Sequence, residues 1–384
     1  MVTSINFFVI LFSALILYWL VPQKFNLRQI ILIVSSFFFI FLNDKNALII
    51  TVVLSIYTYL IGLLILKSRK KNIFHFLSVT GLLLILVFFK YTGLLTSALY
   101  SLSNSLKILP RFDISTIVLP LGLSYIILKH ISYLTDIKWG IIKDSNLLEF
   151  LNYSSLFTIF TAGPIERFER FQPQVRNNEL KFEWIFIDEG FQRIVFGLFK
   201  KFAIADWIAY YINPVWENTA EYSLWIKAVS LLGFSFQIYF DFSGYSDIAI
   251  GSSRLFGLKI MENFDYPYLK RNISQFWRAW HISLSDWIRD YIFMPLGRIS
   301  QNKIWFLFFV PVISMGICGI WHGAKWGFLV WGIWHGLGIS VYQIILYLER
   351  KNSKFKRYNQ KIFTKPIAIF VNFLFVTIGW IWFI

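Results

Sequence analysis

The stretch WHGAKWGFLVWGIWH, residues 321–335, joins two long apolar runs of the chain. The runs, residues 304–320 and 327–347, have the length of about 17–25 apolar residues with which an α-helix crosses a bilayer. Backbone polar groups inside lipid must be paired within their own segment, which favours helices over open sheets. The stretch therefore predicts a helical membrane fold. It also holds two of the five histidines, His322 and His335.

The composition of the whole chain agrees with this prediction. Of the 384 residues, 57% are hydrophobic and 15% are charged, whereas a soluble domain averages about 45–50% apolar and about 25% charged residues. We expect an all-α, polytopic integral membrane protein with roughly nine to eleven transmembrane helices, some of them short enough to be re-entrant or tilted. The candidate spans are residues 5–21, 30–42, 47–66, 76–89, 116–128, 148–162, 194–212, 224–240, 304–320, 327–347 and 366–384.

The positive charge of the chain indicates its orientation in the membrane. A net charge of +16 suggests nucleic acid as the partner of a soluble protein, but in a membrane protein it is typical of cytoplasmic loops. Basic clusters follow the first and third spans, at Lys24, Arg28 and residues 66–72, and another lies at 350–361. Two spans separate the first two clusters, so we expect an extracytoplasmic N-terminus and no nucleic-acid partner. The first span lacks a basic start and a cleavage site, so we expect it to be retained.

Polar chemistry is concentrated in the second half of the chain. Residues 1–115 carry little of it and read as scaffold helices, whereas residues 262–298 are dense in tryptophan and arginine. That block is too polar to cross lipid alone and suits an interfacial or broken helix that lines a cavity. Within it, Asp286 and Asp290 share a helix face, and Arg289 can neutralise one of them. An internal ion-pair network is the alternative reading of the same charges.

The histidine spacing argues against a metal site. His322 and His335 are thirteen residues apart, about 220° around a straight helix, whereas helical metal ligands sit three or four residues apart. A break at Gly323 would change the angle without restoring that spacing. The single cysteine, Cys318, excludes a cysteine-rich site and an intrachain disulfide. A buried neutral histidine can act as a general base, so His322, His281 and His335 are candidates, with structural histidines as the alternative.

Two long motifs carry a family resemblance. FWRAWHISLSDWIRDYIFMPLG (276–297) and GIWHGAKWGFLVWGIWHG (319–336) resemble the membrane-bound O-acyltransferase (MBOAT) family, in its bacterial branch of alginate and other polysaccharide O-acetyltransferases. The collinear resemblance also includes TAGPIERF, GLFKKFAIAD and ENFDYPY. It implies a single membrane domain with helices around a central funnel, a catalytic core over residues 116–345, scaffold helices over 1–115, and a basic loop and last span over 346–384.

The resemblance also implies the chemistry. The histidine of the WHGA motif, here His322, is catalytic in the family, and His281, which closes FWRAWH, is the second signature residue. His322 would take the proton of an acceptor hydroxyl, and His281 would orient His322 or the acceptor, or donate to the oxyanion. Arg271, Arg278 and Lys270 could hold the donor's phosphates, although positive-inside bias explains the same residues. We expect further substrate-binding side chains at Arg271, Arg278, Trp277, Trp280, Asp286, Asp290 and His335.

The substrates and partners follow from the same resemblance. We expect an acyl thioester, acetyl-CoA, as donor substrate, with no tightly bound cofactor and no metal. The acceptor would be an exported or cell-envelope polysaccharide. An extracytoplasmic acetyltransferase would be the partner protein, and the location would be the cytoplasmic membrane of a bacterium.

Other functions remain open on the sequence. D-alanyl transfer to teichoic acid from a carrier-protein thioester uses a related fold. A transporter or flippase could use intramembrane His and Asp side chains as proton relays, and a non-catalytic scaffold of an export complex is a third alternative. The chain ends inside an apolar run, residues 366–384, where family members continue further. It therefore reads as a short member or as one that lacks C-terminal spans.

Overall fold

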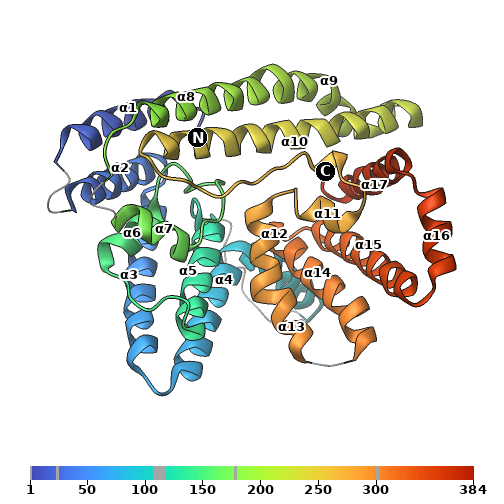
Figure 1. Cartoon of the computed structure of the whole chain (residues 1–384), viewed down its shortest axis with the longest axis horizontal. Helices are drawn as coiled ribbons and strands as arrows, with labels where there is room; N and C mark the ends of the chain where they lie inside the picture. The colour runs from blue at the N-terminus through green and yellow to red at the C-terminus, as the bar shows by residue number, and fades with distance from the viewer. Residues whose placement is uncertain (1, 23–25, 107–117, 177–179, 300–301) are drawn as a thin grey trace. The chain divides into compact units, whose positions relative to one another are not determined.

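The chain is helical throughout the computed structural model, which describes residues 2–22, 26–106, 118–176, 180–299 and 302–384, with only the backbone of 94–106, 358 and 360. Within these ranges, extended backbone pairs at one isolated bridge between Phe264 and Trp280. Figure 1 shows the α-helices in chain order. They are α1 (Ile5–Leu20), α2 (Leu27–Asn43), α3 (Lys45–Lys67), α4 (Lys71–Leu106), α5 (Leu123–Trp139), α6 (Leu147–Ser155), α7 (Phe168–Arg176), α8 (Trp184–Leu198), α9 (Asp206–Glu217), α10 (Leu224–Leu255), α11 (Ile273–Trp277), α12 (Ile282–Ile288), α13 (Met294–Ile299), α14 (Val310–His322), α15 (Trp326–Lys351), α16 (Ser353–Ile362) and α17 (Lys365–Gly379).

The chain forms two compact units. The first comprises Met1–Gln192 and Ala249–Ile260, and the second comprises Arg193–Ile248 and Met261–Ile384. Helices α8 and α10 contribute residues to both units. The expected substrate-binding and catalytic residues all belong to the second unit.

The prediction of an all-α polytopic membrane protein is confirmed. Among the described residues, five segments are long and apolar enough to cross a membrane, and α1 and α2 are shorter apolar helices. Some expected spans have other lengths. Helix α6 ends at Ser155, before the expected end at residue 162, and α10 runs on to Leu255, past the expected end at 240. The five segments are Lys45–Lys67, Lys71–Gly93, Trp305–His322, Trp326–Lys351 and Lys365–Trp382.

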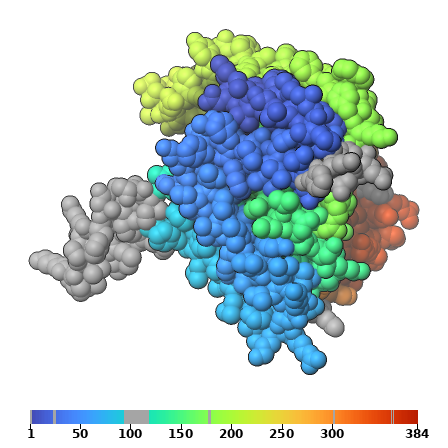
Figure 2. Space-filling view, turned by 90° about the vertical axis from the view of Figure 1, so that its left-hand side faces the viewer, coloured from blue at the N-terminus to red at the C-terminus, as the bar shows by residue number. Residues whose placement is uncertain are grey.

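The first unit separates apolar from small or polar side chains. Helices α2, α3 and α4, drawn in shades of blue in Figure 2, carry exposed apolar side chains, among them Val34, Ile49, Val53, Leu77 and Leu84. The buried faces of α2 and α3 hold Ser36, Thr51, Ser55 and Thr58. Small and hydroxyl side chains at helix contacts are typical of membrane proteins, because they allow backbones to approach closely. Helices α2, α3 and α4 thus carry the exposed apolar side chains that a lipid-facing surface requires.

Two histidines of the first unit make side-chain hydrogen bonds. His130 is fully buried, with Nδ1 3.0 Å from Oγ1 of Thr58 and Nε2 2.9 Å from Oγ of Ser154. His75 lies with Nε2 3.0 Å from Oγ1 of Thr135. Because a buried imidazole is stable when both nitrogens have partners, packing and hydrogen bonding account for His130.

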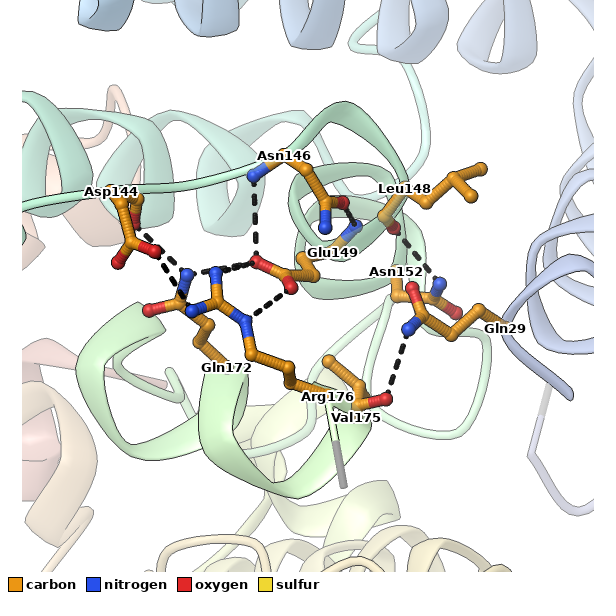
Figure 3. A network of polar contacts seen from close by, with 9 residues as sticks. All are labelled: Gln29, Asp144, Asn146, Leu148, Glu149, Asn152, Gln172, Val175 and Arg176. Atoms are coloured by element: carbon orange, nitrogen blue, oxygen red, sulfur yellow. Dashed lines mark hydrogen bonds and ion pairs between the residues drawn. The ribbon is translucent and has the colours of Figure 1, made fainter. Parts of the chain in front are cut away.

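A charged network joins α6 to α7 (Figure 3). Asn146 and Glu149 form a capping box at the start of α6. The Glu149 carboxylate is 1% exposed and accepts from Nε of Arg176 at 2.6 Å and from Nη2 at 2.8 Å. Arg176 also donates to Asp144 at 2.8 Å, and Gln172 donates to Glu149 at 2.8 Å. The hydrogen bond that Arg176 donates to Glu149 raises the pKa of Arg176. A buried carboxylate needs such partners, since its desolvation is otherwise uncompensated.

Replacing Arg176 by alanine should lower the stability of the protein. Glu149 would keep Gln172 and its own capping bond but lose a bidentate cation, and hydrogen bonds to charged groups are worth about 1.5–3 kcal/mol. Because Arg176 is partly exposed, we expect a loss of about 2 kcal/mol, near the lower end of that range. Thermal unfolding in detergent, followed by fluorescence-detected size exclusion, measures it. Glu169→Ala, at an exposed charge on the same helix α7, is the control; an equal loss there would contradict the expectation.

The second unit contains a second charged network, between α8 and α10. Asp247 accepts from Arg193 at 2.9 Å and from Lys200 at 2.5 Å, and Asp241 accepts from Lys201 at 2.5 Å. Both aspartates are therefore ion-paired. The segment that carries both lysines, Phe199–Ala205, is π-helical, and the helices touch closely at Gly197 and Gly244. The cations of this basic segment are thus held by internal carboxylates.

Candidate active site

A short pairing of extended backbone places His281 beside Asn263. The Phe264–Trp280 bridge is flanked by hydrogen bonds from Asp265 N to Ala279 O at 3.0 Å and from Ile282 N to Asn263 O at 2.9 Å. His281 then starts α12 with a φ of 43°. Positive φ is uncommon for a side chain other than glycine and costs about 1–3 kcal/mol, which is typically tolerated at functional sites. The unfavourable backbone conformation at His281 therefore sets the direction of its ring.

The ring of His281 is buried and lies near His322. The residue is 2% exposed and packs against Phe242 with ring centroids 4.6 Å apart. Burial lowers its pKa well below the usual value, and the neighbouring His322 lowers it further. Nδ1 lies 3.3 Å from Oδ1 of Asn263. Two histidines 41 positions apart in the sequence (281 and 322) thus interact electrostatically.

His322 ends α14, and the helix breaks directly after it. Gly323 is fully extended and α15 begins at Trp326, so His322 and His335 lie on two helices. The angle of about 220° between the two histidines assumes one straight helix. It does not apply, because the helix is broken at Gly323. The His322 ring sits among Trp321, Phe328, Trp331 and Phe383, with centroid distances of 5.0–6.2 Å.

His335 lies behind Trp331, one helical turn further along α15. It is fully buried, and its ring centroid is 5.0 Å from that of Trp331 and 5.2 Å from that of Trp277. Trp331 therefore separates the two rings of His322 and His335. His335 is placed to support the aromatic wall rather than to meet His322 directly.

Several buried polar atoms of this region lack a hydrogen-bond partner in the described part of the chain. They are Nε1 of Trp277 and Trp331, Nε2 of His281 and both ring nitrogens of His335. An unpaired buried donor or acceptor costs about 1–3 kcal/mol, and such groups in native proteins call for an explanation such as water or a ligand. Their concentration around His281 and His335 makes the region a candidate binding site. No group of three or more potential metal-ligating side chains occurs among the described residues.

A cavity of about 210 Å³ lies between α11, α12, α14 and α15. Four of the expected or related residues line it: Trp277, Arg278, Asp286 and Arg289. Its wall on α14 includes Cys318, one turn before His322 on that helix. Ser314 and Gln343 also line it, and each has a buried oxygen without a partner in the described chain. The cavity is apolar with a charged edge.

The remaining expected residues are placed elsewhere. Arg271 lines a different groove, of about 610 Å³, along α15, α16 and α17. Trp280 is buried against Phe276, and Asp290 accepts from Arg289 at 2.8 Å. Arg289 also donates to Asp286 at 2.5 Å. Asp286 and Asp290 therefore form the ion-pair network that was the alternative prediction. Arg271 and Arg278 line different cavities.

The sequence reasoning missed several residues of the site. Asn263 lies within the ENFDYPY motif, but no functional role was predicted for it. A polar residue in an aromatic motif was a usable signal. Trp380 and Phe383 pack against Trp331 at 6.0 and 5.3 Å and lie beyond the expected core of residues 116–345. No local pattern links them to His322.

Apolar spanning helices, two histidines among aromatic rings and a neighbouring cavity with an arginine at its edge are the features expected of a membrane-embedded transferase. The family model for membrane-bound O-acyltransferases matches residues 30–380. The chain belongs to the MBOAT family, and it is an acyltransferase and a multi-pass membrane protein.

Curated relatives differ in acceptor. The protein named "Probable alginate O-acetylase AlgI" of Pseudomonas putida is 32% identical over 393 residues, covering 99% of this chain and 76% of the relative. The peptidoglycan O-acetyltransferase of Helicobacter pylori is 30% identical, covering 92% of this chain and 70% of the relative. The teichoic acid D-alanyltransferase of Streptococcus thermophilus is 30% identical over 66% of this chain and 65% of its own length.

Proposed function

We propose that the protein transfers acetyl groups from acetyl-CoA to hydroxyls of an exported or cell-envelope polysaccharide. The observation that carries the proposal is the placement of two histidines among aromatic rings beside one cavity. His281 is buried against Phe242, and His322 lies in an aromatic cluster one helical turn from Cys318 in the wall of the 210 Å³ cavity. The alginate and peptidoglycan relatives, which align over more of this chain than the D-alanyl relative, favour acetyl transfer to a polysaccharide.

The proposed reaction needs one base and no metal or redox group. His322 removes the proton of the acceptor hydroxyl while that oxygen attacks the thioester carbonyl carbon. The tetrahedral intermediate expels the thiolate, and the imidazolium of His322 returns the proton to its sulfur, so the products are an ester and a thiol. Aromatic rings around His322 exclude water, which would otherwise hydrolyse the thioester.

The 210 Å³ cavity is the proposed place of the donor. Its apolar wall suits the methylene-rich arm of a thioester, and Trp277, Ser314 and Gln343 offer unpaired polar atoms to the arm's amides. Arg278 at its edge would hold a phosphate. Lys270, a third basic candidate, is already paired with Asp265 at 2.6 Å. The cavity therefore favours Arg278 over Arg271 and Lys270 as the phosphate ligand.

Arg278→Ala should raise the KM for acetyl-CoA by about 10-fold, the lower part of the range for one hydrogen bond to a charged group. The KM for acetyl-pantetheine, which lacks the phosphates, should stay unchanged. Purified protein and radiolabelled donors measure both constants. Arg271→Ala, in the other groove, is the matched control. Equal effects of both variants, or an equal effect of Arg278→Ala on both donors, would reject this assignment.

The test of the proposed function is the ester content of the cell's surface polysaccharides. Mild alkali releases esters from purified polymers of wild-type and deletion strains, and mass spectrometry identifies the acid. We expect acetate to fall in the deletion strain. A loss of D-alanine instead would support the teichoic acid alternative, and no loss of either would leave a transporter or scaffold role. The extracytoplasmic partner, the cytoplasmic-membrane location and the outward N-terminus are part of the same proposal.

A further inference from the structure

Asn263 holds a central position between three groups of the site. The residue is fully buried, with 0% of its surface accessible to solvent. Oδ1 accepts from Oγ of Ser283 at 2.7 Å and from the Ser283 backbone N–H at 3.3 Å, and Nδ2 donates to Oγ of Ser246 at 3.1 Å. The same Oδ1 lies 3.3 Å from Nδ1 of His281. The amide therefore bridges α10, α12 and the active-site histidine.

These contacts determine which amide atom faces the histidine. A backbone N–H can only donate, so the Asn263 atom opposite Ser283 N must be the oxygen. Nδ1 of His281 faces that same oxygen, and two acceptors would repel each other. Nδ1 must therefore carry a hydrogen. A neutral imidazole has one N–H, so Nε2 keeps its lone pair.

The neutral form is expected for this ring. Burial lowers the pKa of His281, and His322 lowers it further. Nε2 is buried and has no hydrogen-bond partner in the described residues. A lone pair in such a place is stabilised only by a donor. No described side chain supplies one, so the donor has to come from a bound substrate.

We propose that Asn263 is a positioning residue that fixes the His281 tautomer, so that the lone pair of Nε2 is left to accept a hydrogen bond from a bound substrate, such as a second hydroxyl of the acceptor. The inference rests on the proposed function. His281 in this tautomer cannot donate from Nε2 to an oxyanion; it orients the acceptor.

Kinetics of the purified full-length protein test the positioning role. Asn263→Ala should lower kcat by about 10–100-fold, as expected for a partner that orients a histidine, and leave the donor KM unchanged. Asn263→Asp keeps the accepting oxygen and should stay within a few-fold of wild type. Ser246→Ala, which removes only the Nδ2 partner, is the matched control and should also stay near wild type. A loss in Ser246→Ala equal to that in Asn263→Ala would make Asn263 a merely structural residue and overturn the proposal.

A double-mutant cycle separates action through His281 from a direct role. In a His281→Gln background, Asn263→Ala should cost less than a few-fold, since the ring it orients is gone. Full additivity of the two losses would overturn the proposal.

The tautomer itself can be measured without any activity. Solid-state NMR of ¹⁵N-histidine-labelled wild-type protein in lipid, with His281→Gln to assign the signal, should show Nδ1 protonated and Nε2 unprotonated. The opposite tautomer would overturn the inference even if acyl transfer is intact. Absence of acyl transfer from acetyl-CoA in the wild type would instead count against the proposed function, and the NMR result would still test the tautomer.

Discussion

His322→Ala should lower acyl transfer by about 10²–10⁴-fold, the usual contribution of a positioned general base. The ring contacts four aromatic side chains at the end of α14, so its removal leaves a space without disturbing the α14–α15 hairpin. The donor KM should change little, because none of the residues lining the 210 Å³ cavity is lost. Initial rates with radiolabelled acetyl-CoA, at matched amounts of protein in membranes, measure the effect.

His75→Gln is the control for this prediction. His75 is another histidine with an ordered ring partner, Thr135, but it belongs to the first unit. It should retain wild-type activity. Wild-type rates in His322→Ala at matched expression would remove His322 from the chemistry and support a scaffold or conduit role.

The helical class was predictable because its signal is local. Apolar runs as long as a bilayer is thick identify α3, α4, α14 with its π-helical start, and α15, and the structure has a helix at each. The boundaries were less predictable where charges interrupt a run. Helix α10 passes Asp241, Asp247 and Arg254 without ending, because its carboxylates are paired with cations from the segment before it.

The residues of the site were predictable only where they lie in a family motif. His281 and His322 were named from two motifs, but their approach depends on a backbone bridge and a helix break that carry no periodic signal. Asn263 reaches His281 because extended segments pair locally, and Phe383 reaches His322 through tertiary packing. Long-range contacts of this kind leave no trace in hydropathy or spacing.

Gly332→Ala should separate helices α14 and α15 and abolish activity. A methyl group at Gly332 would overlap the carbonyl oxygen of Met315, and one at Gly319 would overlap the carbonyl oxygen of Phe328. At Gly336 it would lie 2.6 Å from Cα of Val312. Because these neighbours are backbone atoms, the helices themselves must move apart. Close packing through glycines spaced four apart, as at 332 and 336, is typical of membrane helices.

The consequence for the site follows from where the hairpin ends. His322 closes α14 and rests against Trp331, the residue before Gly332. A displacement of about 1 Å can cost about 10²-fold in rate, and overpacking costs about 1–3 kcal/mol in stability. We therefore expect at least about a 100-fold loss of acyl transfer, together with a lower unfolding temperature in detergent.

Gly316→Ala is the matched control on the same hairpin. A methyl group there would meet only Cδ1 of Leu329, at an ordinary contact distance of 3.9 Å. Alanine also favours a helix over glycine by about 0.8–1.0 kcal/mol, so this variant should keep its activity and gain slightly in stability. If Gly316→Ala and Gly332→Ala lose activity equally, loss of glycine flexibility rather than contact between the helices would be the cause. Normal activity of Gly332→Ala would show that the hairpin can open without moving His322 away from His281.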